Sequence, residues 1–242
     1  MTSNPMMNPK VVENVILDSK PMTIQGSINK TLILTGIVAL SGLYTWDLMA
    51  KGFMDKANLF IISSLVIGII LAIVTAFNPR ASKITAPAYA LCEGLLAGAV
   101  SYAYNSLYNG IVVNAVVLTL LVLFTMLFLY KARVIQATEK FRQVILISTI
   151  AIAIFYAIGM IGAFFGHPMT VFNGSVMGIV ISVVICAIAA LNFILDFDFV
   201  EQGEKRNLPD YFEWYCAFSL LVTLIWLYFE ILRLLAQLQR RD

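Results

Sequence analysis

The sequence predicts an all-α integral membrane protein of seven transmembrane helices, and three observations carry that prediction. Of the 242 residues, 60% are hydrophobic and only 12% are charged, whereas about a quarter of the residues of a soluble domain are charged. Seven separate stretches each supply the roughly 20 mostly apolar residues that a spanning helix needs. None of them alternates in polarity over about ten residues, as a membrane β-strand would.

The spans follow one another along the chain with short connectors, so neighbouring helices are expected to pack antiparallel. The predicted spans are about 31–50, 58–77, 84–104, 110–130, 142–165, 171–195 and 212–237. Residues 1–30 are polar and contain three prolines, so we expect a partly disordered cytoplasmic tail rather than a signal peptide. Residues 31–237 form one membrane domain, followed by a short C-terminal tail at 238–242.

The orientation follows from the distribution of basic residues, because cytoplasmic loops carry an excess of Lys and Arg. One side of the membrane receives Lys10, Lys20, Lys30, Arg80, Lys83, Lys131, Arg133, Lys140, Arg142, Lys205 and Arg206. The other side receives Lys51, Lys56, Arg233, Arg240 and Arg241. The N-terminus is therefore predicted to be cytoplasmic, and seven spans place the C-terminus outside.

The motifs of common enzymes are missing from the sequence, which contains no HExxH, GxSxG, P-loop or GxGxxG pattern. The cysteines Cys92, Cys186 and Cys216 lie in apolar stretches without metal-site or redox spacing, and the single histidine, His167, sits in a connector. A net charge of +2 without a basic cluster excludes a nucleic-acid partner. We expect no enzymatic activity and no cofactor.

Glu93, in "AYALCEGLLAGAV", is the most informative residue of the sequence. It lies about nine residues into the third span, hence about 14 Å deep at about 1.5 Å per residue. An acid at mid-bilayer costs about 2.5–3.5 kcal/mol on insertion scales. We therefore expect Glu93 to line an ion pathway, the alternative being a neutral carboxyl hydrogen-bonded to a neighbouring helix.

Glu230, in "WLYFEILRLL", is a second acid within a span and a second candidate for the ion pathway. Arg233 follows at i+3 and could pair with it on the same helix face. An interfacial ion pair is therefore the competing interpretation. For Asp47, which follows Trp46 at a helix end, an ordinary interfacial role is favoured.

A third group of acids ends the sixth span, in "NFILDFDFVEQGEKRNLPDYFEW". Asp196 and Asp198 are expected to close that helix, and an acidic loop leads to Glu213. Arg80, at the end of the second span, is a natural counter-ion for them. Carboxylates suit Ca²⁺ or protons, so Asp196 and Glu213 are candidate Ca²⁺ ligands, and Arg80, Asp196, Asp198 and Glu213 form a candidate gate.

These features together resemble the Bax inhibitor-1 family, in its bacterial YccA-like branch. The resemblance is carried by "AFNPRASKITAPAYALCEGLLAG", "NFILDFDFVEQG" and "LLVTLIWLYFEILRLL" and covers about residues 31–237. It implies six helices wrapped around a central seventh, and a pH-sensitive Ca²⁺ leak in the bacterial inner membrane. It also implies a latch in which Arg80 meets a pair of acids, the first of which is Asp196.

The position of the second acid of that pair has three candidates. Matching the local motif "LYFEI" places it at Glu230, whereas matching the chain ends places Thr223 there and leaves no acid. By depth along the helix, Glu213 is the nearest acid to Asp196.

Two further functions compete with the leak. Members of the family are also linked to cell-death suppression and to modulation of a membrane AAA protease, which would make the chain a regulator that acts by protein contacts through its N-terminal tail. A proton-coupled transporter would need broken helices or inverted repeats, for which only the third span, with Pro87 early and glycines later, gives a hint.

Overall fold

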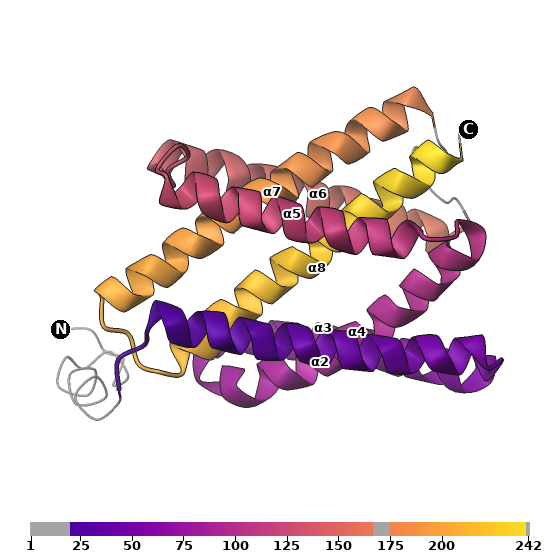
Figure 1. Ribbon diagram of the computed structural model, residues 1–242, viewed down its shortest axis with the longest axis horizontal. Coiled ribbons are helices and arrows are strands. Elements are labelled where there is room, and N and C mark those ends of the chain that lie inside the picture. The colour runs from indigo at the N-terminus through magenta and orange to yellow at the C-terminus, as the bar shows by residue number, and fades with distance from the viewer. Residues whose placement is uncertain (1–19, 167–174, 241–242) are drawn as a thin grey trace. The chain divides into compact units, whose positions relative to one another are not determined.

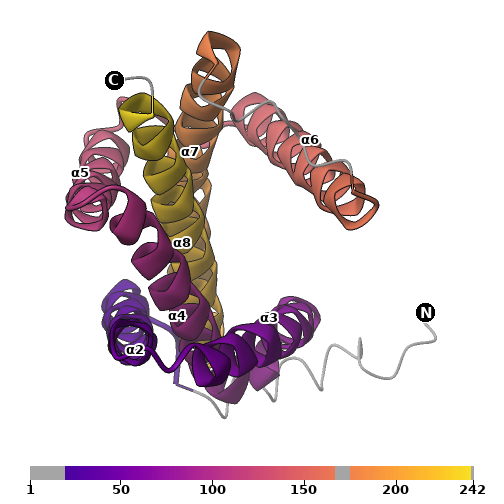
Figure 2. The ribbon, with the colours of Figure 1, turned by 90° about the vertical axis from the view of Figure 1, so that its right-hand side faces the viewer.

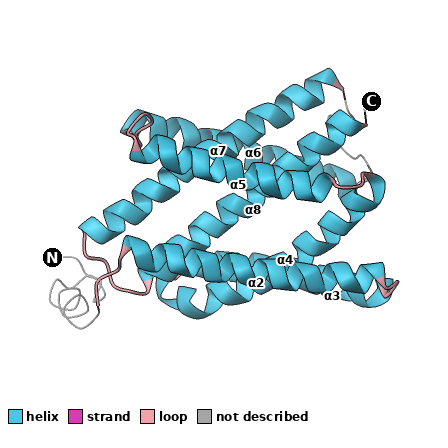
Figure 3. Ribbon diagram, in the orientation of Figure 1, coloured by secondary structure: helices cyan, strands magenta, loops and turns pink. Residues whose placement is uncertain are grey.

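The computed structural model describes residues 20–166 and 175–240, and within these ranges the chain is helical and has no strand (Figure 3). Seven helices are long and apolar enough to cross a membrane, which confirms the predicted fold class. They are α2 Ile24–Ala50, α3 Met54–Phe77, α4 Ser82–Leu107, α5 Ile111–Lys131, α6 Glu139–Phe164, α7 Val176–Lys205 and α8 Phe212–Gln239 (Figure 1). A short 3₁₀ turn, η2 (Pro79–Ala81), leads from α3 into α4.

Helix boundaries fall at residues whose local chemistry starts or ends a helix. Thr23 precedes α2, and its hydroxyl oxygen accepts the N–H of Gly26, which satisfies one of the free donors of the first turn. Thr138 does the same before α6. Gly110, at a φ of 81°, takes up the left-handed conformation in the turn between α4 and α5.

The first helix begins earlier than the sequence predicted. Residues 24–30 were expected to belong to a polar tail, but they form the first two turns of α2. The hydropathy pattern locates the apolar part of a span, whereas the helix starts at its cap, Thr23, outside that part. Residues 1–19 of the predicted tail lie outside the described residues.

The sixth span also continues beyond its predicted end near residue 195, because α7 runs through Lys205. Asp196 and Asp198 therefore do not close the helix. Its polar extension is supported by side-chain contacts one turn apart, where Gln202 donates to Asp198 at 2.8 Å and Lys205 pairs with Glu201. The start of the predicted span, residues 171–174, and His167 lie outside the described residues.

The helices gather into two compact units. The described part of unit 1 is residues 20–102 and 198–221, which contain α2, α3, most of α4, the end of α7 and the start of α8. The described part of unit 2 is residues 103–166, 175–197 and 222–240, which contain the last turn of α4, α5, α6 and the remaining parts of α7 and α8. Each unit thus contains its own portion of α8.

In unit 1, α4 lies between α2 and α3 (Figure 2). A side chain at Gly98 would put its Cβ 2.1 Å from the carbonyl oxygen of Gly42, and one at Gly94 would clash with Val38 and Ser41. The two helices therefore approach each other backbone to backbone, as small residues permit in membranes. On the other side, a Cβ at Gly68 of α3 would lie 3.7 Å from the Cβ of Cys92.

In unit 2, apolar packing is joined by polar contacts between helices. Phe193 of α7 and Leu232 of α8 are fully buried. The amide of Asn192 donates to the hydroxyl of Thr149 on α6 at 3.0 Å, and the amide of Gln237 donates to Ser182 on α7 at 2.7 Å. Such hydrogen bonds between helices satisfy polar side-chain donors in a bilayer core that contains no water.

The last helix is the most enclosed of the seven. In its most apolar window, 56% of the residues of α8 are buried, compared with 50% for α4 and 6% for α6. This burial is consistent with the predicted central position of the C-terminal helix.

Gly98 provides a test of the α2–α4 contact. Gly98→Ala is expected to lower the free energy of unfolding by about 2 kcal/mol, because the added methyl group forces two tightly packed backbones apart. Gly36→Ala is the matched control, since no atom lies within 4 Å of its added Cβ, and it should be neutral or slightly stabilising. SDS titration in mixed micelles measures the unfolding free energy of both variants. Equal destabilisation of the two variants would contradict the close approach of the α2 and α4 backbones.

Candidate functional site

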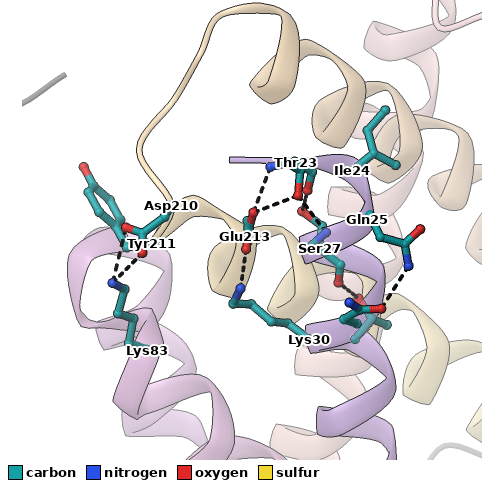
Figure 4. Close-up of polar contacts among 12 residues, drawn as sticks. Thr23, Ile24, Gln25, Ser27, Lys30, Lys83, Asp210, Tyr211 and Glu213 are labelled. Carbon is teal, nitrogen blue, oxygen red and sulfur yellow. Dashed lines mark hydrogen bonds and ion pairs between the residues drawn. The ribbon is translucent and has the colours of Figure 1, made fainter. Parts of the chain in front are cut away.

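Glu213, a predicted gate residue and Ca²⁺ ligand, holds the start of α2 (Figure 4). One carboxylate oxygen accepts the backbone N–H of Thr23 at 2.8 Å and its hydroxyl at 3.1 Å. The other oxygen pairs with the ammonium group of Lys30. The Glu213 side chain is only 10% exposed, so this is a largely enclosed ion pair at the start of α8. We name these contacts of Thr23 and Lys30 with Glu213 the clasp.

The end of α7 and the following loop strengthen the clasp. Glu204 accepts the backbone N–H of Ile24 at 2.9 Å, so two carboxylates satisfy donors at the α2 N-terminus, where the helix dipole also favours negative charge. The backbone N–H of Met22 donates to the carbonyl oxygen of Leu208 at 2.7 Å. Gly26 leaves space for the carboxyl group of Glu213, which a Cβ would approach to 2.2 Å.

A second set of contacts ties the start of α4 to the same region of unit 1. The ammonium group of Lys83 lies 3.0 Å from the nearer carboxylate oxygen of Asp210 (Figure 4). The hydroxyl of Ser82 donates to the backbone carbonyl of Tyr211 at 3.1 Å. Asp210 and Lys83 are both more than 40% exposed, so their ion pair contributes little to stability. The acidic segment after α7 thus anchors helices at one end of unit 1.

Asp196 is buried in unit 2, and its partner on α8 is a hydroxyl group. Thr223 donates to a carboxylate oxygen of Asp196 at 2.6 Å. Of the three candidates for the residue opposite Asp196, the structure brings Thr223 into contact with it. Glu213 instead belongs to unit 1, and Glu230 lies about two turns further along α8.

The other two predicted gate residues lie in unit 1. Arg80 is exposed in η2 and takes part in no ion pair within residues 20–166 and 175–240. Asp198 is half-buried and accepts a hydrogen bond from Gln202. A latch between Arg80 and Asp196 would join the two units and stays a prediction.

Glu230 is enclosed by donors in unit 2. It is 1% exposed and accepts the Tyr156 hydroxyl at 2.7 Å, the indole N–H of Trp226 at 3.2 Å and the Arg233 guanidinium at 3.1 Å. Arg233 also lies over the Tyr156 ring, 4.9 Å from its centroid. The pairing with Arg233 that the i+3 spacing suggested is confirmed, and the cluster links α6 to α8.

Asp47 likewise follows the ordinary interpretation, since it pairs with Lys51 one turn later and both side chains are more than half exposed.

Glu93 differs from these acids because it lines an open recess in unit 1. A cavity of about 120 Å³ lies between α3 and α4 and is lined by Ser64, Leu65, Gly68, Ile69, Ala72, Tyr89, Glu93 and Leu96. Glu93 is half-buried there, beside the phenol of Tyr89 one turn earlier. No ion pair involves Glu93 in the part of the chain that the structure describes.

The described residues contain no group of three or more His, Cys, Asp or Glu side chains that could hold a metal ion. The two candidate Ca²⁺ ligands, Asp196 and Glu213, belong to different units. The Ca²⁺ site therefore stays a prediction.

The sequence analysis did not identify Thr23, Lys30 and Ser64 as site residues. Thr23 could have been predicted as a helix cap from the sequence, since Thr at the boundary of an apolar run is a common N-cap residue. Lys30 and Glu213 lie 183 positions apart in the sequence, so no local spacing predicts their pairing. Ser64 is one of several hydroxyl residues in apolar helices, and only the cavity singles it out.

The clasp can be tested by charge removal. Glu213→Gln keeps an oxygen for the Thr23 N–H but leaves the Lys30 ammonium group without its counter-charge, so the free energy of unfolding should fall by about 1.5–3 kcal/mol. Asp47→Asn, which breaks an exposed pair, should cost less than about 1 kcal/mol. SDS titration of both variants measures the difference, and equal losses would argue against a stabilising clasp.

The Glu230 cluster predicts a non-additive pair of substitutions. Arg233→Met leaves a buried carboxylate without its counter-charge and should cost about 3–5 kcal/mol of unfolding free energy. The double variant Glu230→Gln with Arg233→Met removes both charges and should recover part of that loss. SDS titration of Glu230→Gln, Arg233→Met and the double variant measures the three losses of unfolding free energy. A loss in the double variant equal to the sum of the two single-variant losses would disprove the coupling.

Comparison with known families finds a match that extends over nearly the whole chain. Residues 4–240 match the family model described as "Bax inhibitor 1 like". Comparisons with the curated proteins and with the solved structures found no match.

Proposed function

The chain belongs to the Bax inhibitor-1-like family, and from that premise we propose that it is a pH-sensitive cation leak that passes Ca²⁺. We place it in the bacterial inner membrane with a cytoplasmic N-terminus, as a non-enzymatic member of the YccA-like branch. In this proposal, Glu93 provides the carboxylate of the ion path and Arg80 with Asp196 provides the gate.

The observation that carries the proposal is the contrast between Glu93 and the other acids of the spans. Glu213 and Glu230 are held by Lys30 and Arg233, and Asp196 accepts a hydrogen bond from Thr223. Glu93 has no basic partner in the described residues and faces a cavity instead. A carboxylate that is expensive to place in a membrane and has no counter-charge is available to a passing cation or proton.

The pH sensitivity in this proposal rests on Glu93 rather than on a pair of acids. Where two carboxyl groups share a site, they share protons and respond to pH as a pair. On α8, Asp196 accepts a hydrogen bond from the Thr223 hydroxyl, where an acid pair would need a second carboxyl group. Glu93, which has no basic partner in the described residues and lines a cavity, is the acid to which we assign the pH response.

The experiment is Ca²⁺ flux into dye-loaded proteoliposomes between pH 5 and 8. We expect wild-type flux to depend on pH, Glu93→Gln to remove most of that dependence, and Asp196→Asn to change the flux through the gate. Glu139→Gln is the control, since Glu139 is an exposed acid in the first turn of α6.

Two results would overturn parts of this proposal. Unchanged flux in Glu93→Gln across that pH range would remove Glu93 from the path. Wild-type flux no greater than that of empty vesicles would favour a regulator that acts through protein contacts, such as contacts with a membrane AAA protease. A truncation that tests that role should remove residues 2–19 only, because Thr23 caps α2.

A further inference from the structure

The recess between α3 and α4 is lined by two polar side chains, Ser64 and Glu93, of which Glu93 has the Tyr89 phenol as a hydrogen-bond partner. Ser63 and Thr75, on the same helix as Ser64, donate their hydroxyl groups to backbone carbonyls of the preceding turn. The Ser64 hydroxyl makes no such bond within residues 20–166 and 175–240, although the residue is only 4% exposed. Glu93, across the recess on α4, has no basic partner in the same ranges.

An unsatisfied polar group in a membrane span is costly because no water is present to replace the missing bond. In the described residues the Ser64 hydroxyl has no hydrogen bond, and Glu93 has the Tyr89 phenol as a partner but no counter-charge. Their placement on one cavity indicates that a bound molecule supplies the missing donors and the positive charge. A carboxylate and a serine oxygen both accept hydrogen bonds. The molecule they suit therefore carries several N–H donors and a positive charge.

The shape of the recess limits which part of that molecule enters. Its volume of about 120 Å³ is well below the roughly 300 Å³ at which pockets for drug-sized ligands begin. Leu65 and Ile69, at its edge, are 48% and 54% exposed. A small polar head fits inside, while an apolar chain attached to it lies along these side chains and in the surrounding lipid.

Gly68 keeps the recess open. It lines the cavity, and a Cβ there would already be in contact with Cys92. A larger side chain at this position would fill the space that the head occupies.

We propose that this recess binds the ammonium head of a single-chain, lipid-soluble primary amine, with Glu93 and Ser64 accepting its N–H donors. An anionic head would be repelled by Glu93, and a quaternary ammonium head has no N–H to donate. The site requires no ion conduction, so it goes beyond the proposed leak and does not depend on it.

The test measures equilibrium binding of radiolabelled decylamine to the protein in phosphatidylcholine nanodiscs, after subtraction of the uptake by protein-free nanodiscs. These lipids carry no primary amine of their own. We expect one saturable site per protein. Its affinity should fall at least about tenfold in Glu93→Gln, which removes a charge-assisted pairing, and less in Ser64→Ala, whereas Gly68→Leu should abolish binding. Glu139→Gln should bind as the wild type does.

Three outcomes would overturn the proposal. Uptake equal to that of protein-free nanodiscs shows partition into lipid only. Equal binding of radiolabelled decanol, or of decyltrimethylammonium, shows that the N–H donors are not recognised. Unchanged affinity in Glu93→Gln shows an apolar groove, and since this substitution removes no side-chain volume it keeps the test valid if Gly68→Leu fails to fold. Because binding is measured without flux, these results are independent of whether the protein conducts.

Discussion

The structure depends on one constraint, which is that a polar group inside a bilayer must find its partner within the protein. The acids of the spans show how this chain meets it. Glu230 is enclosed by Tyr156, Trp226 and Arg233, and Glu213 is held by Thr23 and Lys30. Hydroxyl groups such as that of Thr75 donate hydrogen bonds to backbone carbonyls of their own helix. Against this background, Glu93 stands out as an acid without a counter-charge in the described residues, and it lines the same recess as Ser64.

The clasp shows how the same constraint sets the ends of helices. A helix that starts at a membrane surface has free N–H groups, and those at the start of α2 are met by the carboxylates of Glu204 and Glu213. These two acids come from segments far away in the sequence. An acidic segment that would serve solubility if it were a free loop is instead part of the packing of unit 1.

The contact between Asp196 and Thr223 bears on how this chain differs from the pattern that its family resemblance suggests. A hydroxyl group can hold a carboxylate in place, but it cannot exchange a proton with it near neutral pH. Thr223 therefore holds one side of Asp196 within unit 2 and does not form an acid pair with it.

The sequence by itself determined the seven spans and the helical class, and it offered the pairing of Glu230 with Arg233 as one of two interpretations, because apolar runs and i+3 spacing are local properties of a chain. It misplaced the start of α2 and the end of α7. Hydropathy marks only the apolar part of a span, whereas a helix extends to its cap, as at Thr23, or to a left-handed residue, such as Asn207 shortly after α7. Only the tertiary structure decided that Thr223 meets Asp196, that Lys30 meets Glu213 and that Ser64 and Glu93 share a recess. These contacts join residues of different helices, and their partners are set by packing rather than by spacing along the chain.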